Sequence, residues 1–233
     1  MMKKGFEIVK QALAEGRNFL LEHEAKALCE KFGIPVTRFK VAKNEEEAVR
    51  YAEEIGFPVV LKIVSPEIIH KSDVGGVVLN IENKEKVRES YRKILENVQK
   101  HKPNVKIYGV IVQEMALPST EVIIGLVKDP QFGPTVMFGL GGIFVEILKD
   151  VSFRVCPITE TDAREMITEI KGYPVLRGYR NLPPADLDAL VKVLLNVSRM
   201  AEEYPEISEM DLNPILVYEK GVKVVDARII ISK

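Results

Sequence analysis

The chain has 233 residues, of which 46% are hydrophobic and 29% charged, a balance typical of a globular protein with one large domain or two lobes of about 110 residues each. Its 33 basic and 34 acidic residues leave a net charge of −1, which argues against a general nucleic-acid-binding protein. No apolar run approaches the roughly 20 residues that span a bilayer, and Glu7 and Glu15 interrupt any secretory apolar core at the basic N-terminus.

The chain contains two cysteines, Cys29 and Cys156, in unrelated sequence contexts. One disulfide is formally possible, but two buried free thiols in a reducing cytosol are the favoured interpretation, which predicts a cytoplasmic protein. A composition rich in Lys, Glu, Ile and Val, with only four Gln, hints at a thermophilic source.

Hydrophobic periodicity predicts alternating helices and strands in the first half of the chain. In chain order these are a helix over 20–32 ended by Gly33 and Pro35, a helix capped by Asn44 and ended by Gly56 and Pro58, a buried strand over 59–64, a polar loop over 65–75, a strand over 76–81 and a helix capped by Asn83. Glu47, three residues after Asn44, is the expected capping partner.

The second half of the chain is richer in strands. The predicted elements are strands over 105–115, 120–127, 134–138 and 143–149, helices over 160–171 and 184–203, and final strands over 214–218 and 222–230 joined by a Glu219-Lys220-Gly221 hairpin turn. This order predicts an α+β architecture with two lobes and a boundary near residue 112. The lobes would be residues 1–112, with Lys62 and the glycine loop around His70, and residues 113–233.

Lys62 lies inside the apolar strand segment Val59-Val60-Leu61-Lys62-Ile63-Val64. Burying a lysine without a partner costs several kcal/mol. Either this is an edge strand whose amine reaches to water, or the ammonium points into a cleft and holds an anion such as phosphate. We favour the second interpretation, which makes Lys62 a candidate phosphate ligand.

A polar loop from Ser65 to Gly76, which contains His70-Lys71-Ser72-Asp73-Val74-Gly75-Gly76, follows that strand directly. Paired glycines allow backbone N–H groups of residues 72–76 to approach phosphate oxygens, although many hairpins also use Gly-Gly. A lone histidine is most often a surface or structural residue. In this loop, however, His70 is a candidate nucleophile, because the neutral imidazole nitrogen can accept a phosphoryl group. The segment matches neither GxxxxGK[ST] nor GxGxxG.

The segment Glu209-Met210-Asp211-Leu212-Asn213-Pro214 is the second informative site. In an extended strand Asp211 and Asn213 point to the same face, and two hard oxygen ligands on one face suit Mg²⁺. The hairpin turn could bring Asp226 beside Asn213. The alternative is a capping Asp/Asn pair at a turn together with a surface aspartate.

Weaker candidates come from three other places. The strand end Gln113-Glu114-Met115 could offer backbone groups to an adenine and a carboxylate to a ribose or amino group. Glu146 and Arg154 flank the segment Gly139-Leu140-Gly141-Gly142 and are possible additional site members.

Taken in order, these residues resemble the β subunit of ADP-forming acetyl-CoA synthetases (acetate–CoA ligase, ADP-forming). The segments that carry the resemblance are VVLKIVSPEIIHKSDVGGV (59–77), VQEM (112–115), KDPQFGPTVMFGLGGIFVEILKDVSFR (128–154), EMDLNPI (209–215) and VVDARI (224–229). The DLNP…DAR pair also looks like the metal site of succinyl-CoA synthetase β chains. The resemblance covers essentially the whole chain.

The resemblance implies an ATP-grasp fold, with a nucleotide (ADP/ATP) bound between two α+β lobes. The implied roles are phosphate contact for Lys62 with Ser72, Gly75 and Gly76, adenine contact for Gln113, Glu114 and Met115, Mg²⁺ ligation for Asn213 and Asp226, phosphate carriage for His70, and orientation of the phosphorylated histidine for Asp211. The implied reaction is acyl-CoA + ADP + phosphate ⇌ carboxylate + ATP + CoA. A CoA-binding α subunit would complete the enzyme, as an α2β2 hetero-oligomer.

Two other functions remain open from the residues. One is a self-contained ATP-grasp carboxylate ligase that uses an acyl phosphate and no phosphohistidine. The other is a non-catalytic subunit that senses nucleotide and regulates a partner. Phosphoryl transfer to His70 distinguishes the phosphohistidine reaction implied by the resemblance from both of these functions.

Overall fold

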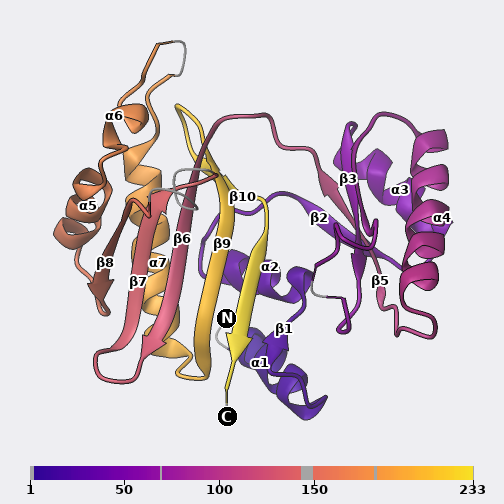
Figure 1. Ribbon diagram of the computed structural model, residues 1–233, viewed down its shortest axis with the longest axis horizontal. Coiled ribbons are helices and arrows are strands. Elements are labelled where there is room, and N and C mark those ends of the chain that lie inside the picture. The colour runs from indigo at the N-terminus through magenta and orange to yellow at the C-terminus, as the bar shows by residue number, and fades with distance from the viewer. Residues whose placement is uncertain (1–2, 69, 143–148, 181–182, 233) are drawn as a thin grey trace. The chain divides into compact units, whose positions relative to one another are not determined.

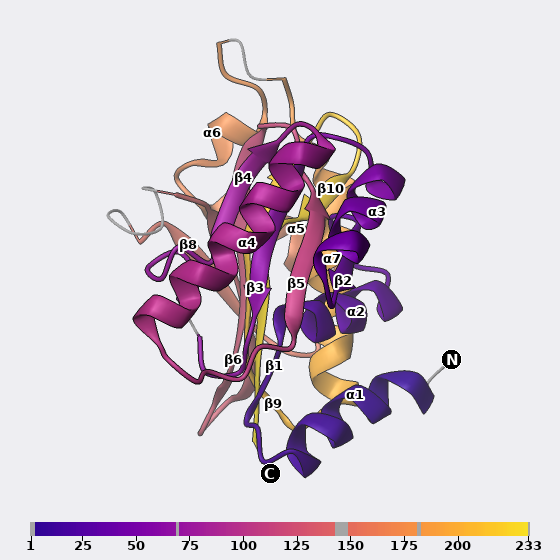
Figure 2. The ribbon, with the colours of Figure 1, turned by 90° about the vertical axis from the view of Figure 1, so that its right-hand side faces the viewer.

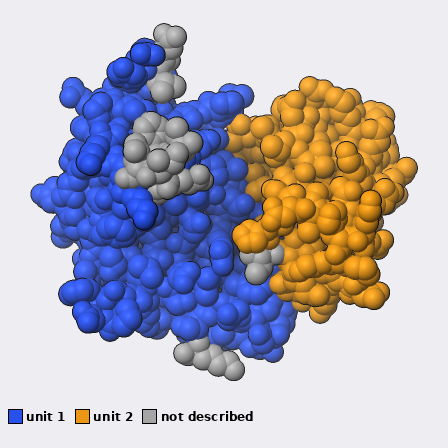
Figure 3. Space-filling model, viewed as in Figure 1, with its two compact units in different colours: residues 1–36, 117–233 blue, residues 37–116 orange. Residues whose placement is uncertain are grey.

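The computed structural model describes all residues except 1–2, 69, 143–148, 181–182 and 233. The chain divides into two compact units (Figure 3). Unit 1 comprises residues 1–36 and 117–233, and unit 2 comprises residues 37–116. Each unit has its own sheet and its own hydrophobic core.

Unit 2 contains a four-stranded antiparallel sheet, called sheet B here, in the order β2-β5-β3-β4. Its elements are β2 (Phe39–Ala42), α3 (Glu45–Ile55), β3 (Val59–Val64), β4 (Val77–Ile81), α4 (Lys84–His101) and β5 (Gly109–Glu114). Figure 2 shows α3 and α4 in front of β3 and β5, on one face of the sheet. The apolar side of each helix packs on that face and forms the core of the unit.

Both long helices of unit 2 begin at the predicted caps. The side chain of Asn44 accepts a hydrogen bond from the Glu47 amide at 2.9 Å, and that of Asn83 accepts one from the Lys86 amide, also at 2.9 Å. Each bond satisfies one of the amide donors that a helix start leaves without an intrahelical partner.

Unit 1 contains a seven-stranded sheet, called sheet A, in the order β1-β11-β9-β6-β7-β8, with β10 paired to β9. Its strands are β1 (Phe19–Leu20), β6 (Thr120–Asp129), β7 (Gly133–Leu140), β8 (Val151–Val155), β9 (Ile207–Val217), β10 (Val222–Val224) and β11 (Ala227–Ile231). Its helices are α1 (Lys3–Ala14), α2 (Glu22–Lys31), α5 (Glu160–Glu169), α6 (Tyr173–Leu176) and α7 (Leu187–Glu203). In Figure 1, α2 and α7 lie behind the strands of this sheet.

The alternation of side chains along β9 shows how sheet A divides into two faces. Met210 and Leu212 are buried in the core formed with the helices, whereas Asp211 and Asn213 are exposed on the opposite face. We call these the helix-covered face and the open face. Among the described residues, no helix is long and apolar enough to cross a membrane.

The division into units differs from the two continuous lobes expected from the sequence. Residues 1–36 belong to unit 1 because β1 pairs with β11 and residues of α2 join the unit 1 core. The chain passes from unit 2 back to unit 1 at residues 116–117 rather than at 112, because β5 continues to Glu114 within sheet B. The pairing of strands from the two ends of the chain could not be predicted, because no short stretch of sequence shows which distant strand it pairs with.

Most predicted elements are present, and the exceptions lie in unit 1. The predicted strand over 222–230 is two strands, since Val225 and Asp226 leave the ladder between β10 and β11. The predicted strand over 143–149 falls mainly on residues 143–148, which lie outside the described residues. Helices α1 and α6 and strands β1, β2 and β8 were not predicted, and of these β2 belongs to unit 2.

Candidate functional site

The open face of sheet A carries a row of polar side chains on β9. Glu209, Asp211 and Asn213 occupy alternate positions and are exposed, as the predicted extended conformation requires. In the described part of the chain, the side chains of these three residues form no hydrogen bond or ion pair. Three polar groups held on a rigid strand and left without protein partners are available to a ligand.

Asp226, between β10 and β11, lies opposite Asn213 of β9. Ile215 pairs with Val224 and Leu212 pairs with Ala227, so the residues between them face one another. The amide of Val225 donates to the carbonyl oxygen of Pro214 at 2.9 Å, which fixes this register. The hairpin therefore brings Asp226 to Asn213, as predicted from the sequence.

The electrostatics of β9 also show the proximity of Asp226. Partial desolvation by the surrounding protein atoms raises the pKa of the Asp211 carboxyl above its ordinary value, the negative charge of Asp226 raises it further, and the cation of Arg228 lowers it. The described residues contain no cluster of three or more His, Cys, Asp or Glu side chains that could hold a metal ion. One amide oxygen and one or two carboxylates nevertheless fit Mg²⁺, which keeps several waters and takes its remaining ligands from substrate phosphates.

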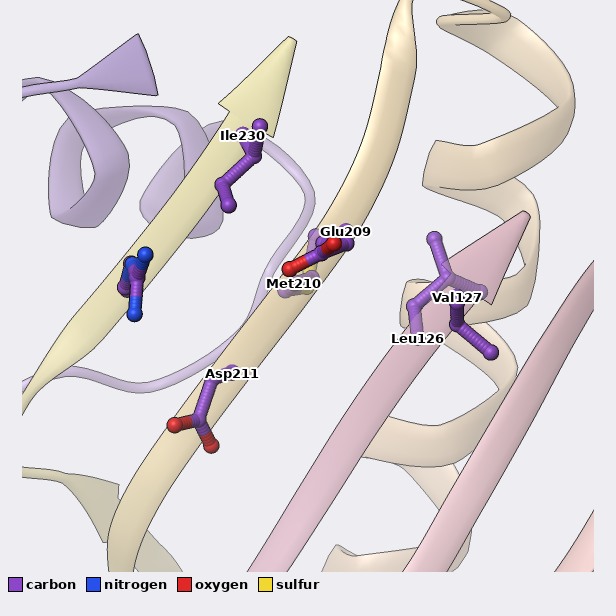
Figure 4. A pocket seen from close by; sticks show the side chains of 7 residues that line it. Leu126, Val127, Glu209, Met210, Asp211 and Ile230 are labelled. Carbon is purple, nitrogen blue, oxygen red and sulfur yellow. The ribbon is translucent and has the colours of Figure 1, made fainter.

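A pocket of about 220 Å³ opens on the same face, over β6, β9 and β11 (Figure 4). Its lining residues are Leu126, Val127, Glu209, Met210, Asp211, Arg228 and Ile230. Figure 4 shows the carboxylates of Glu209 and Asp211 extending from β9, with Val127 on the neighbouring strand. Arg228 was not a candidate from the sequence, although its alternation with buried Ala227 and Ile229 would have placed it on the side of Asp211.

In unit 2, Lys62 lies on β3, which has β5 on one side and β4 on the other. Its side chain is buried, with 6% of the residue exposed. The edge-strand interpretation of Lys62 is therefore wrong, because β3 is an interior strand. A buried ammonium on an interior strand is the kind of group that proteins retain for charge recognition.

The segment of residues 65–76, called the His70 loop here, connects β3 to β4, and His70 is exposed. Its first part is fixed at Glu67, where the Lys102 ammonium donates to the carbonyl oxygen at 2.7 Å and the carboxylate accepts from the Lys106 amide at 2.9 Å. The neighbouring Ile68 is buried in the core of unit 2. The loop therefore has a fixed base and presents His70 to solvent.

The two glycines at the end of this loop have a structural role. The Gly75 amide donates to the Ser72 carbonyl oxygen at 3.0 Å and the Gly76 amide donates to that of Lys71 at 2.7 Å. A Cβ on Gly76 would lie 2.6 Å from Ile63, so only glycine allows this close packing. In this conformation both glycine amides bond within the loop rather than pointing at a phosphate, contrary to the expectation, while Ser72 is exposed.

The strand end at Gln113 to Met115 is buried in sheet B at its first two residues. The Glu114 carboxylate accepts hydrogen bonds from the Arg38 amide and from Arg38 Nε, each at 3.0 Å. One oxygen thus meets the backbone amide of Arg38 and the other its guanidinium, whereas the sequence suggested a ribose or amino group as partner. The Met115 amide donates to the Pro58 carbonyl oxygen at 3.1 Å.

Of the two possible additional residues, Arg154 does not join the cluster on the open face. Arg154 pairs with Val136 of the core, and its guanidinium binds Glu169 and Glu165 of α5, with Nη1 2.9 Å from Glu169 Oε2. It therefore acts on the helix-covered face, where it ties β8 to α5. Glu146 lies outside the described residues.

Comparison with known proteins agrees with this arrangement. A family model described as an ATP-grasp domain matches residues 11–231. The chain is 56% identical over 228 residues, 98% of each chain, to the β subunit of ADP-forming acetate–CoA ligase I of Pyrococcus furiosus.

Two solved structures are also close to the chain. The dinucleotide-forming acetyl-coenzyme A synthetase 1 of Ca. Korarchaeum cryptofilum, in complex with coenzyme A, Ca-AMPCP and HgCl+, has a TM-score of 0.95 at 56% identity, over 97% of this chain and 99% of that one. The same enzyme in complex with coenzyme A and Mg-AMPPCP has its phosphohistidine segment pointing towards the nucleotide-binding site. That structure has a TM-score of 0.88 at 52% identity, over 98% of this chain and 100% of that one.

The chain belongs to the ATP-grasp family. Within that family its relatives are β subunits of ADP-forming acetyl-CoA synthetases, which are acid–thiol ligases. The chain is therefore the nucleotide-binding β subunit of such a ligase. The fold and the family that the sequence predicted are both confirmed.

Proposed function

We propose that this subunit transfers a phosphoryl group between ADP/ATP and the imidazole of His70, within the reaction acyl-CoA + ADP + phosphate ⇌ carboxylate + ATP + CoA. The observation that carries the proposal is the position of His70, which is exposed on a loop whose base is fixed by Glu67 and Ile68. A nucleophile on such a loop can meet a ligand while the scaffold keeps its position.

The nucleotide and metal ligands follow from the residues described above. Lys62, with Ser72 of the His70 loop, contacts phosphate oxygens, and Gln113 to Met115 line the adenine end mainly through backbone groups. Asn213 and Asp226 ligate Mg²⁺, which when bound neutralises charge on the phosphate oxygens. Asp211 orients or stabilises the phosphorylated form of His70.

This subunit is cytoplasmic and needs a partner. A CoA-binding α subunit completes the reaction, and the two form an α2β2 hetero-oligomer. The support for this proposal is the name of the P. furiosus relative, a β subunit, which the chain matches over nearly its full length. Alone, the chain should produce no ATP from acetyl-CoA, ADP and phosphate; production by the isolated chain would contradict the need for a partner.

The test of the proposal is labelling of the chain with [γ-³²P]ATP and Mg²⁺. We expect one acid-labile, base-stable label in the wild type and none in His70→Ala. His101→Ala is the matched control, because His101 is also an exposed histidine of unit 2, at the end of α4, and it should label normally.

The outcomes separate the three functions. A self-contained carboxylate ligase would consume ATP with a carboxylate substrate and acquire no label. A nucleotide sensor would bind ADP without transfer, even with its partner added. Full labelling of His70→Ala would remove His70 from the mechanism.

A further inference from the structure

Arg228 of β11 is an exposed cation on the open face of sheet A. It pairs with Asp211 of β9, while its neighbours Ala227 and Ile229 are buried in the core. Over the described residues, the guanidinium forms no hydrogen bond or ion pair, not even with Asp211. Its N–H donors are therefore available to an oxyanion.

Arg228 lies in the row of side chains next to the proposed metal site, and both belong to unit 1. Asn213 and Asp226 form one row across the sheet, and Asp211 and Arg228 form the next row of the same face. Successive rows on one face are two residues apart, about 7 Å along a strand. An oxyanion that ligates a metal ion at the first row therefore comes within reach of the long Arg228 side chain.

The row with Arg228 also has room for a ligand. On the other side of Asp211, strand β6 places Gly125, which has no side chain. The pocket in Figure 4 opens over this part of the sheet, with Val127 and Ile230 as apolar walls. A group of several atoms, such as a phosphoryl group, can therefore enter and contact the guanidinium.

The charges on the open face select the ligand. Glu209, Asp211 and Asp226 are three carboxylates around one guanidinium, so this face repels a free anion. A divalent metal ion at Asn213 and Asp226 offsets the excess negative charge, and metal-bound phosphates then meet a guanidinium at the next row. The planar fork of an arginine matches two oxygens of one phosphoryl group. An adenine or a ribose, being uncharged, gains little from such a site.

We propose that Arg228 binds the terminal phosphoryl group of Mg²⁺-bound ATP. The inference rests on the proposed function, which makes Asn213 and Asp226 the Mg²⁺ ligands. In Mg²⁺-bound ATP the metal bridges oxygens of the β- and γ-phosphates, and the γ-phosphoryl group carries the larger share of the negative charge. Arg228 thus gives unit 1 a contact that ATP makes and ADP lacks, and the contact depends on the metal.

The experiment measures Kd values by isothermal titration calorimetry on the full chain, for the non-hydrolysable ATP analogue AMPPCP and for ADP, each with Mg²⁺. We expect Arg228→Ala to raise the Kd of AMPPCP by about tenfold or more and that of ADP by less than about twofold. For AMPPCP, Arg228→Lys should lie between the wild type and Arg228→Ala, because it keeps the charge and loses the fork. With EDTA in place of Mg²⁺, the wild type and Arg228→Ala should bind AMPPCP equally weakly.

Arg164→Ala is the matched control. Arg164 is also an exposed arginine of unit 1, but it lies on α5 and forms ion pairs with Glu160 and Asp188. Exposed ion pairs of this kind contribute little, so the variant should fold normally and keep both wild-type Kd values.

The outcomes distinguish this inference from the proposed function. A wild-type Kd for AMPPCP in Arg228→Ala, or an equal loss of AMPPCP and ADP binding, overturns the role of Arg228 while His70 remains the carrier. A loss in both Arg228 variants that follows an equal fall in melting temperature assigns Arg228 to the fold and also overturns it. A selective loss of AMPPCP binding in a chain that labels no histidine supports this inference and overturns phosphoryl transfer to His70. A wild type that binds neither nucleotide overturns both.

Discussion

The side-chain amide of Asn97, on helix α4, donates a hydrogen bond of 3.3 Å to the carbonyl oxygen of Gly75 at the end of the His70 loop. Gly75 has a φ of +62°, and a Cβ at this position would lie 2.6 Å from Asn97 Nδ2. The conformation of the His70 loop therefore depends on a helix that carries none of the proposed ligands.

Gly75→Ala should displace the end of the His70 loop and slow the labelling of His70. The positive φ alone costs a non-glycine residue about 1–2 kcal/mol, and the clash with Asn97 adds to it. Gly16→Ala is the control, because Gly16 has a φ of +73° with no atom within 4 Å of its Cβ. Urea unfolding and initial labelling rates measure the two effects. Equal losses of stability and unchanged labelling in both variants would contradict the steric argument.

Lys62→Met should weaken nucleotide binding. The substitution keeps an unbranched apolar stem in the interior of sheet B and removes only the ammonium, and urea unfolding measures its separate effect on the fold. Loss of the ammonium should raise the KM for ATP about tenfold or more. Lys40→Met, on strand β2 of the same sheet, removes an exposed ammonium and should leave the KM for ATP unchanged. An unaltered KM in Lys62→Met would exclude contact with phosphate.

Asn213→Ala and Asp226→Ala should each raise the Mg²⁺ concentration needed for half-maximal labelling of His70 by about tenfold or more. The register of β9 against β10 and β11 places these two residues opposite each other, and in the proposed metal site each supplies an oxygen ligand. Glu219→Ala, in the exposed turn of the same hairpin, removes a carboxylate outside the proposed metal site and should keep the wild-type Mg²⁺ dependence. If all three variants share the wild-type curve, the metal site lies elsewhere.

Asp186→Asn should lower the stability of unit 1 in a pH-dependent manner. The carboxylate accepts hydrogen bonds from the Ala189 amide at the start of α7 and from the Gly221 amide in the β9–β10 turn, at 2.9 and 2.7 Å. The two amides hold the pKa of Asp186 below its ordinary value, with the Gly221 contact dominant.

Because the folded pKa is depressed, the carboxylate stabilises the fold above the unfolded pKa of about 3.9, and this contribution is lost as the pH falls through the folded pKa. Urea unfolding should show a deficit in Asp186→Asn of about 1 kcal/mol at neutral pH that shrinks below pH ~4. A deficit that stays constant down to pH ~3 would show that charge has no part in it.

Most helices and strands of unit 2 could be predicted from short-range sequence patterns. The apolar run at Val59 to Val64 predicted β3 with its observed bounds, and Asn44 and Asn83 predicted the two helix starts, because caps and apolar periodicity act within a few residues. Strand β8 and the place of residues 1–36 depend on pairing between distant segments. Such pairing is set by the whole core and leaves little trace in a single window of sequence.

The candidate site divides in the same way. Asp211, Asn213 and Asp226 could be placed together because alternation along one strand and a short hairpin are local geometry. Glu114 could not be placed with Arg38, since 76 residues separate them. The hydrogen bonds of the Gly75 and Gly76 amides within the loop could not be predicted either, because they depend on the turn that the loop adopts.

The chain passes between the two units twice, and both passages leave each unit at a single place. In unit 1, Val36 bridges to Val224, and the Tyr218 hydroxyl donates to the Leu117 carbonyl oxygen at 2.9 Å, so both points lie at the β9–β10 hairpin. In unit 2, Phe39 pairs with Gln113. Residues 37–116 thus form an inserted cassette whose two ends are adjacent. A short peptide joining Val36 to Leu117 should let unit 1 fold without residues 37–116. The corresponding segments of related enzymes should be exchangeable at the same two junctions.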